Sequence, residues 1–365
     1  MLSDIIIEKI QKDGPLSFHD YMEMALYYPG LGYYTSPAEK IGKKGDYYTS
    51  PYLTYLFGDI IARQMEEMWV KLDKAPFTIV EYGAGPGTLC NDILNQLKNY
   101  PDLYEVVNYC IIEKSAEMRT LQGELLGEKV TWVDSISELK EFTGCVLANE
   151  VVDNFAVHLV EMKDELMEVF VDYHDGFREL LRPADIKLKE YLEELRVQLP
   201  PGNRAEINLQ AIDWISEIAA SLKKGFLLTI DYGNTSPVLY TEARRLGTLL
   251  CYHKHSINEN FYSNIGKQDI TAHVNFSALS HYGKKQGLQT IGLSTQSHFL
   301  LSLGLSNHLR ALETQPGNEL ESTAERMMVI NNFLVDMGRK IKVLIQQKGL
   351  ERPQLLGMQF ATAAL

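Results

Sequence analysis

The nine residues 81–89, with the sequence EYGAGPGTL, constrain the fold more than any other segment. They follow the apolar run 77–80 and precede apolar residues at helical spacing, so they predict a strand, a glycine turn and a helix. Gly83, Gly85 and Gly87 alternate along the turn, and glycines let a ligand lie against the backbone. The predicted helix begins with unpaired N–H groups facing that ligand. The spacing E-x-G-x-G-x-G also differs from the G-x-G-x-x-G of a dinucleotide-binding turn.

Short apolar segments alternate with helical periodicity from residue 77 onward. Strands that are apolar throughout are typical of a parallel sheet with both faces covered. The alternation therefore predicts an α/β fold with a doubly wound, mostly parallel sheet. The expected strands are 77–82, 109–113, 131–133, 145–148 and 226–231, and the expected helices are 53–69, 88–98, 115–126 and 210–223.

The remaining segments predict additions to this core. We expect an N-terminal helical cap or substrate region at 1–75, and then a catalytic domain at 76–365 with insertions at about 155–205 and 234–275. Residues 234–275 have weak periodicity and predict a long loop with isolated strands, and loops of such length are usually functional or partly disordered. The other expected elements are helices at 2–11, 17–26, 185–197 and 323–334, a hairpin of strands 157–160 and 168–173, a strand at 289–293 and an edge strand within 354–362.

Composition excludes several classes of function. The formal net charge of −13 disfavours general binding to nucleic acid, which needs a basic surface. The four cysteines form no C-x-x-C pair and predict buried thiols in a reducing compartment. No apolar run reaches the roughly 18 residues of a membrane span, and the start resembles no presequence. We therefore expect a cytoplasmic, bacterial protein with no membrane partner. His253 and His255 form an H-x-H pair without further ligands at suitable spacing, so we expect no metal.

The glycine turn resembles the cofactor loop of class I S-adenosylmethionine (SAM) methyltransferases, with Glu81 and Ala84 in the same loop as its three glycines. Other strand ends carry side chains that suit the same cofactor. Glu113 ends the second strand, where two carboxylate oxygens can accept from two ribose hydroxyls. Asp134 and Ser135 follow the third strand and are candidates to face the adenine. These ends meet at the carboxyl edge of the sheet, where α/β proteins bind ligands.

The fourth strand ends in Asn149 and Glu150, at the predicted position of the transferred methyl group. Methyl transfer needs alignment of the acceptor with the S–CH₃ bond. Fixed carboxylates help if the acceptor is a cationic guanidinium, because they orient it and offset its charge. Glu150 and Asp153 are candidates for such a pair, with Asn149 beside them. Asp153 is equally suited to cap a helix after the strand.

Seven blocks in the chain match, in order, blocks of the MidA family, and the chain resembles that family over roughly residues 14–300. The mitochondrial members are protein-arginine methyltransferases needed for assembly of respiratory complex I. The resemblance implies a Rossmann-like fold with a seven-stranded sheet, SAM as cofactor, a protein substrate such as a complex I subunit or its bacterial counterpart, and a possible homodimer. The blocks are 14–22, 28–34, 44–51 with 57–58, 81–89, 149–155, 231–233 and 268–276.

The resemblance also implies site residues outside the glycine loop. Residues 45–50 would fold over the SAM site, where Asp46 and Thr49 are candidates to contact the cofactor or the substrate, and a structural turn is the alternative. Tyr48 is a separate candidate to line the acceptor channel, and ordinary packing explains it equally well. Gln268, Asp269 and His273 would lie near the acceptor pocket, although His273 is also suited to a structural role. The chain departs from the family where it has Pro86 between two loop glycines, and where DNFA at 153–156 replaces D-A-L-P, which changes the acceptor pocket.

Three alternatives remain open. The acceptor could be a small molecule or another protein side chain. It is not expected to be adenine or glutamine, because the chain lacks the two prolines of Asn-Pro-Pro-Tyr after strand four. The protein could instead be an assembly factor that binds SAM with little turnover. An NAD-dependent enzyme is disfavoured, because it should show G-x-G-x-x-G and an acid closer to the loop than Glu113.

Overall fold

The computed structural model describes residues 1–37, 40, 46, 50–313 and 319–362. The chain divides into two compact units, each built from segments far apart in the sequence. We call one the sheet unit, formed by Thr49–Val151, Ile215–Tyr232 and Tyr282–Leu365. We call the other the insertion unit, formed by Met1–Tyr48, Val152–Trp214 and Gly233–His281. Residues 50–75, which the sequence analysis grouped with an N-terminal cap, belong to the sheet unit. The predicted division by function, into a cap and a catalytic domain, stays a prediction.

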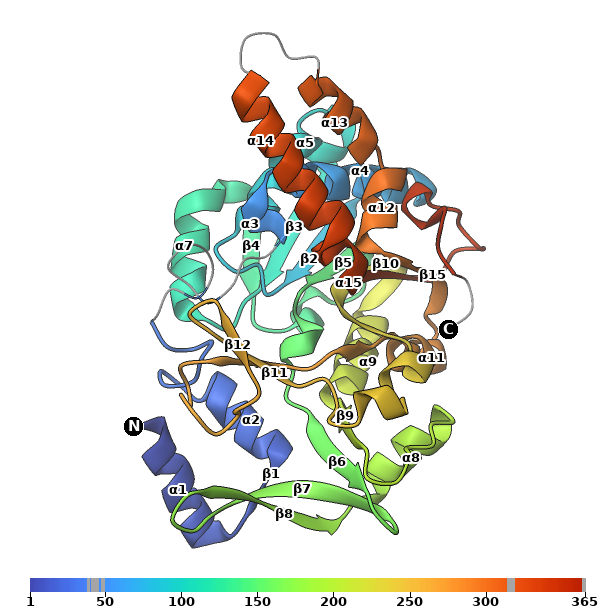
Figure 1. Cartoon of the computed structure of the whole chain (residues 1–365). Helices are drawn as coiled ribbons and strands as arrows, with labels where there is room; N and C mark the ends of the chain where they lie inside the picture. Colours follow the sequence, from blue (N-terminus) through green and yellow to red (C-terminus); the bar gives the residue numbers. More distant parts are fainter. Residues whose placement is uncertain (38–39, 41–45, 47–49, 314–318, 363–365) are drawn as a thin grey trace. The chain divides into compact units, whose positions relative to one another are not determined.

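Seven strands form the main sheet of the sheet unit in the order β15-β16-β10-β5-β2-β3-β4 (Figure 1). An eighth, two-residue strand, β14 (Val274–Asn275), pairs with the end of β10. The five strands from β10 to β4 are parallel, and β16 is antiparallel to both of its neighbours. The prediction of a mostly parallel sheet is therefore confirmed, and the predicted number of seven strands holds for the main path without β14. The strands are β2 (Phe77–Tyr82), β3 (Val107–Ile112), β4 (Val130–Val133), β5 (Phe142–Asn149), β10 (Leu222–Asn234), β15 (Gln289–Thr295) and β16 (Ile341–Lys348).

The C-terminal part of the sheet differs from the sequence prediction. β16, which lies between β10 and β15, was not predicted. The edge strand predicted within 354–362 is wrong. That segment forms a 3₁₀ turn at Leu356–Met358 and a single bridge from Thr362 to Leu293. β16 pairs with one side of β15 along six residues, and the described part of the tail pairs with the other side of β15 only through that bridge.

Helices of the sheet unit cover the apolar strands. The buried face of α4 (Leu56–Lys71) packs with α5 (Thr88–Leu97) against β2, β3 and β5. Other helices in this unit are α3 (Ser50–Leu53), α6 (Pro101–Val106), α7 (Ala116–Leu126), α12 (Gln296–Ser302), α13 (Leu305–Glu313), α14 (Glu319–Val329) and α15 (Met337–Lys340). The predicted helix at 323–334 is α14 followed by a π-helical segment, Ile330–Val335. Helix α9 (Gln210–Ser221) connects the two units along the chain.

The insertion unit has its own sheet and its own apolar core. Its strands are ordered β1-β7-β6-β9, and β8 pairs with the other side of β7. The predicted hairpin is confirmed as β6 and β7, while β8 was missed. Helices α1 and α2 pack their apolar faces into this core. The elements are α1 (Leu2–Asp13), β1 (Leu16–Ser17), α2 (Phe18–Tyr27), β6 (His158–Met162), β7 (Leu166–Tyr173), β8 (Phe177–Pro183), α8 (Ile186–Glu194) and β9 (Arg204–Ile207).

Residues 234–275 are more ordered than the predicted long loop. They form an antiparallel three-stranded sheet of β11 (Leu250–His253), β12 (Ser256–Asn258) and β13 (Asp269–Thr271). A tight turn joins β11 to β12 through Lys254 and His255, both in left-handed backbone. The strands are too short to show a period in the sequence, and pairing between them creates the order. The chain continues through α10 (Ser236–Leu239), β14 (Val274–Asn275) and α11 (Phe276–Lys285).

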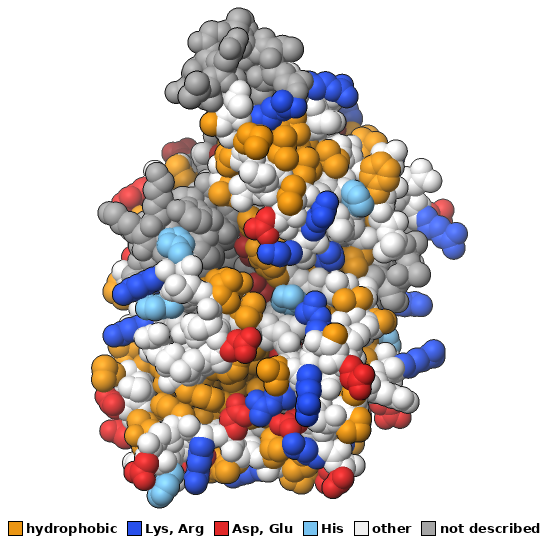
Figure 2. All heavy atoms as spheres, viewed as in Figure 1, with side chains coloured by type: hydrophobic (Ala, Val, Ile, Leu, Met, Phe, Trp, Pro, Cys, Tyr) orange, Lys and Arg blue, Asp and Glu red, His pale blue; other side chains and the backbone are white. Residues whose placement is uncertain are grey.

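The distribution of surface charge and the state of the cysteines are those of an ordinary globular protein. Figure 2 shows acidic and basic side chains intermixed across the visible face, so the net charge is not gathered there into one acidic field. The four cysteines are free and buried, as predicted. Among the described residues, no helix is both long enough and apolar enough to cross a membrane.

Candidate active site

The glycine loop after β2 turns through left-handed backbone. Gly83, Gly85 and Gly87 have φ angles of 60°, 53° and 89°, which glycine adopts without steric cost. Gly87 is the N-cap residue of α5, so the loop ends at a helix N-terminus, where the first N–H groups have no acceptor within the helix itself. The predicted strand, turn and helix are therefore confirmed. The bare backbone and the helix start suit a ligand with polar groups along one edge.

Glu81 lies behind the loop, in the core. Its side chain is 2% exposed, and Oε2 accepts a hydrogen bond of 2.8 Å from the Tyr109 hydroxyl. Burial raises the pKa of Glu81 to about 7, against the opposing effect of the Tyr109 hydrogen bond. The carboxyl is thus held within the strand layer, and direct contact with the cofactor stays a prediction.

Glu113 lies beside the glycine loop. The amide of Gly83 donates to the carbonyl of Ile112, which brings the end of β3 next to the end of β2. Glu113 is 9% exposed, and its Oε1 accepts a hydrogen bond of 2.8 Å from the Ser115 amide. Burial raises the pKa of Glu113 above its ordinary value. The structure therefore brings the predicted ribose acid and the loop together.

Asp134 and Ser135 follow β4 at the same sheet edge. The Asp134 carboxylate is exposed and forms an ion pair with Arg119 of α7, Nη2 to Oδ1, at 2.5 Å. The Ser135 hydroxyl accepts from the Ser137 amide and caps a 3₁₀ turn, Ile136–Leu139. Ser135 thus has a structural task, and contact of either residue with adenine stays a prediction.

The end of β5 places Glu150 in strained backbone. Its φ angle of 54° is uncommon for a residue with a side chain. Its Oε1 lies 3.4 Å from the backbone nitrogen of Ser50 and 3.4 Å from Nδ2 of Asn149. Burial, followed by the nearby charge of Asp231, raises the pKa of Glu150 to about 8. Oδ1 of Asn149 is buried and has no hydrogen-bond partner within the part of the chain that the structure describes.

Three residues near Glu150 were not among the predicted site residues. Asp231 is fully buried, and its carboxylate accepts from the amides of Val151 and Tyr232 at 3.1 and 2.8 Å. The Ser50 hydroxyl lies 3.4 Å from Oε1 of Gln296, which is also fully buried. The position of Asp231 in β10, at the sheet edge that carries Asn149, was a usable signal. No sequence signal connected Ser50 with Gln296, because they lie 246 positions apart.

A second polar cluster lies within the insertion unit. The Tyr34 hydroxyl donates to both oxygens of Asp269, at 2.9 and 2.8 Å, and the Tyr33 hydroxyl donates to Asp46 at 2.8 Å. Burial raises the pKa of Asp269 to about 7, the Tyr34 bond opposes this, and Asp46 adds to it. The backbone nitrogen of Lys254 also donates to Asp46. The predicted residues Asp46 and Asp269 thus share one cluster.

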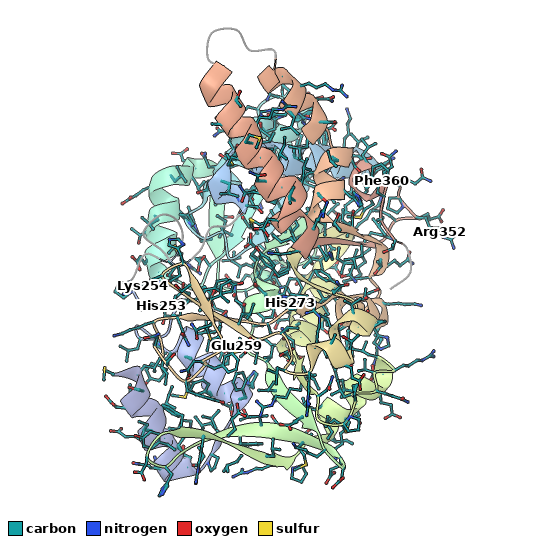
Figure 3. The ribbon with its side chains drawn as sticks, in the orientation of Figure 1. His253, Lys254, Glu259, His273, Arg352 and Phe360 are labelled. Atoms are coloured by element: carbon teal, nitrogen blue, oxygen red, sulfur yellow. The ribbon has the colours of Figure 1, made fainter. Side chains whose placement is uncertain are left out.

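The other predicted substrate residues have structural partners. Gln268 is buried, and its Nε2 donates to the Asn260 carbonyl at 2.8 Å, which organises the loop before β13. Nδ1 of His273 lies 3.2 Å from Nη1 of Arg244. In Figure 3, His273 lies apart from the adjacent pair His253 and Lys254.

Asp153 belongs to a short 3₁₀ turn of the insertion unit, Val152–Asn154, and its carbonyl accepts from the Ala272 amide. Its pairing with Glu150 stays a prediction. Tyr48 and Thr49 lie outside the described residues.

Comparison with known sequences extends these observations. Residues 60–294 match the model of a family described as "Putative S-adenosyl-L-methionine-dependent methyltransferase". A relative from Caenorhabditis elegans, named protein arginine methyltransferase NDUFAF7 homolog, mitochondrial, is 27% identical, covering 93% of this chain and 85% of the relative. The mouse protein named protein arginine methyltransferase NDUFAF7, mitochondrial, is 26% identical, covering 86% and 76%.

Solved structures agree in fold. A crystal structure from Burkholderia thailandensis with S-adenosyl-homocysteine bound has a TM-score of 0.90 and 29% identity, covering 99% of this chain and 95% of that one. A second crystal structure from the same organism has a TM-score of 0.86 and 28% identity, covering 99% and 94%. The similarity therefore extends over both units of the chain.

Proposed function

Since this chain belongs to that family and is a SAM-dependent methyltransferase, we propose that its methyl acceptor is the guanidino group of an arginine in a protein. When bound, SAM supplies an electrophilic methyl group on a cationic sulfur. The chain's own residues must then hold the cofactor and align the acceptor.

Residues at the edge of the sheet fit SAM. In this proposal the backbone of Gly83–Gly87 lies against the cofactor, because the three glycines adopt left-handed backbone and carry no side chain that would keep a ligand away from it. The Glu113 carboxylate accepts hydrogen bonds from the ribose hydroxyls, and its place beside Gly83 supports this. Asp134 contacts the adenine from the neighbouring strand end. Ala84 lies within the glycine loop and is assigned to the same contact as the loop backbone.

The geometry at Glu150 is the observation that most supports an arginine acceptor. A carboxyl held in left-handed backbone, beside an unpaired buried oxygen of Asn149, offers two acceptors to a planar group with several N–H donors. Methylation of a guanidinium releases one proton. The Glu150 carboxyl can receive that proton only in its ionised form. Burial raises its pKa to about 8, and a cationic guanidinium bound beside it would favour the ionised form again. The names of the relatives from mouse and C. elegans support the same acceptor.

Transfer of labelled methyl groups tests the acceptor. The purified protein would be incubated with methyl-tritiated SAM and a protein extract from cells that lack its gene, including subunits of respiratory complex I or their counterparts. After hydrolysis of the protein fraction, we expect the label in methylarginine. The matched control is Glu150→Gln, which keeps the shape of the side chain and should keep the stabilisation by SAM while losing the label.

Two results would contradict the proposed acceptor. Label in another amino acid or in the small-molecule fraction would move the acceptor to a different class. Stabilisation by SAM without any transferred label would favour an assembly factor with little turnover. Neither result would alter the assignment of the cofactor.

A further inference from the structure

Gln122 of α7 has an unusual position for a polar side chain, because it is fully buried in the sheet unit. Its amide group contacts three different strand ends. Nε2 donates to the carbonyl oxygen of Gly85 at 2.7 Å and lies 3.4 Å from Oε2 of Glu113. Oε1 accepts from Nε1 of Trp132, on β4, at 2.8 Å. One side chain thus connects the glycine loop, the acid after β3 and the strand β4.

The chemistry of these partners fixes the orientation of the amide. The Trp132 ring nitrogen can only donate, and the Gly85 carbonyl can only accept. Nε2 must therefore face the loop and Glu113, while Oε1 faces Trp132. A glutamate at position 122 would direct an oxygen at the Gly85 carbonyl and at the Glu113 carboxylate, so it could not replace the glutamine.

These contacts also determine how Glu113 is presented. Its Oε1 accepts from the Ser115 amide and its Oε2 faces Nε2 of Gln122, so both oxygens are held. Each carboxylate oxygen can accept more than one hydrogen bond, which leaves capacity on both for two further donors. Two vicinal hydroxyls are donors of that kind, and they need a carboxylate with a fixed plane.

We propose that Gln122 is a positioning residue for the cofactor, which holds the Glu113 carboxylate in the plane that accepts from both ribose hydroxyls. The proposal rests on the ribose contact assigned to Glu113 under the proposed function. It adds that selectivity for an intact ribose depends on Gln122, a residue that does not itself touch the hydroxyls.

Binding of S-adenosyl-homocysteine and of its 3′-deoxy analogue, measured by calorimetry, tests the proposal. A hydrogen bond to a charged group contributes about 1.5–3 kcal/mol, so the full-length protein should prefer the intact ligand by roughly tenfold or more. In Gln122→Leu this preference should fall to about threefold or less, because the intact ligand loses affinity and the analogue keeps it. Gln122→Glu has the same shape as the native residue and should lower the preference in the same way.

Leu126→Ala is the matched control. Leu126 lies one turn along α7 and faces Gly87, but it offers no hydrogen bond. This variant should lower the thermal midpoint and keep the preference for the intact ribose. Equal weakening of both ligands in Gln122→Leu and Gln122→Glu would show a merely structural role and overturn the proposal. Equal binding of both ligands by the native protein would overturn it together with the Glu113 assignment. Neither result depends on the methyl acceptor.

Discussion

Strands β2 and β5 lie side by side in the sheet and end at the same edge, yet they turn in different ways. After β2 the chain enters left-handed backbone at Gly83, with φ 60°. After β5 it does so at Glu150, with φ 54°. A Cβ atom on Gly83 would lie 3.3 Å from a methyl group of Val151, the residue after Glu150, so the two turns are also close in space.

The difference between the two turns indicates different roles, because one exposes its backbone and the other holds a side chain in place. The turn after β2 leaves its backbone bare, as a cofactor that lies against the chain requires. The turn after β5 keeps a side chain where strain of about 1–3 kcal/mol is typical. Such strain persists only where the surroundings hold it, and the buried Asp231 carboxylate does so by accepting from the Val151 amide. We infer that the strained backbone at Glu150 is retained because the function requires its carboxyl at this position.

The largest expected effect comes from a side chain in the first turn. Gly85→Val places a β-branched residue at φ 53° and fills the space next to the backbone. A hundredfold excess of SAM over its dissociation constant should stabilise the native protein by about 2.7 kcal/mol, and the variant should lose that stabilisation. Thermal unfolding with and without SAM measures it. Retention of the full shift in the variant would contradict a cofactor site at this loop.

The next effect concerns the second turn. Glu150→Gln should lower kcat about 100-fold or more, the usual loss when a positioned acid–base group is removed, and should keep the SAM-induced thermal shift. Glu150→Gly should relieve the backbone and lose the same activity without losing stability. Steady-state kinetics with an arginine acceptor, together with urea unfolding, separate the two effects. If Glu150→Gly kept its activity, the strained turn after β5 would not be explained by a need for the Glu150 carboxyl.

A smaller effect follows from the raised pKa of Glu150. Below its ordinary pKa of 4.5 the carboxyl is protonated in both the folded and the unfolded protein. The folded protein keeps this proton up to about pH 8, so the free energy of unfolding should fall as the pH rises from 4.5 to 8. Glu150→Gln should remove part of this slope. The rest persists, because burial also raises the pKa values of Glu81 and Asp269. Identical slopes in urea titrations of both proteins would contradict the shift.

The smallest effect comes from a glycine outside both turns. Gly123 lies in α7, is exposed, and has open space where a Cβ would be placed. Gly123→Ala should raise stability by roughly 0.5–1 kcal/mol and leave SAM binding unchanged. Thermal unfolding measures both. A loss of SAM binding would show that any glycine replacement near the loop is harmful, which would weaken the conclusion from Gly85→Val.

Patterns local in the sequence predicted the parallel part of the sheet and the positions of several candidate site residues at its edge. The run into residues 81–89, the apolar strands and Glu113 after a strand are all contiguous signals, and each lies where it was predicted. The sequence predicted neither the sheet within residues 234–275 nor β16. These strands are defined by pairing with partners that lie elsewhere in the chain. Gln268 shows the same limit, because no local pattern predicted its hydrogen bond to the Asn260 carbonyl, while its contact with substrate stays a prediction.

The sequence by itself determined the parallel strands and the helices between them, the glycine turn and the acids that end the strands, because periodicity and turn chemistry act over a few residues. The tertiary structure alone decided that Glu150 occupies left-handed backbone near Ser50 and Asp231, and that Gln122 is buried against Glu113. Ser50 and Glu150 are 100 positions apart, and only packing of the sheet and its helices brings such residues together.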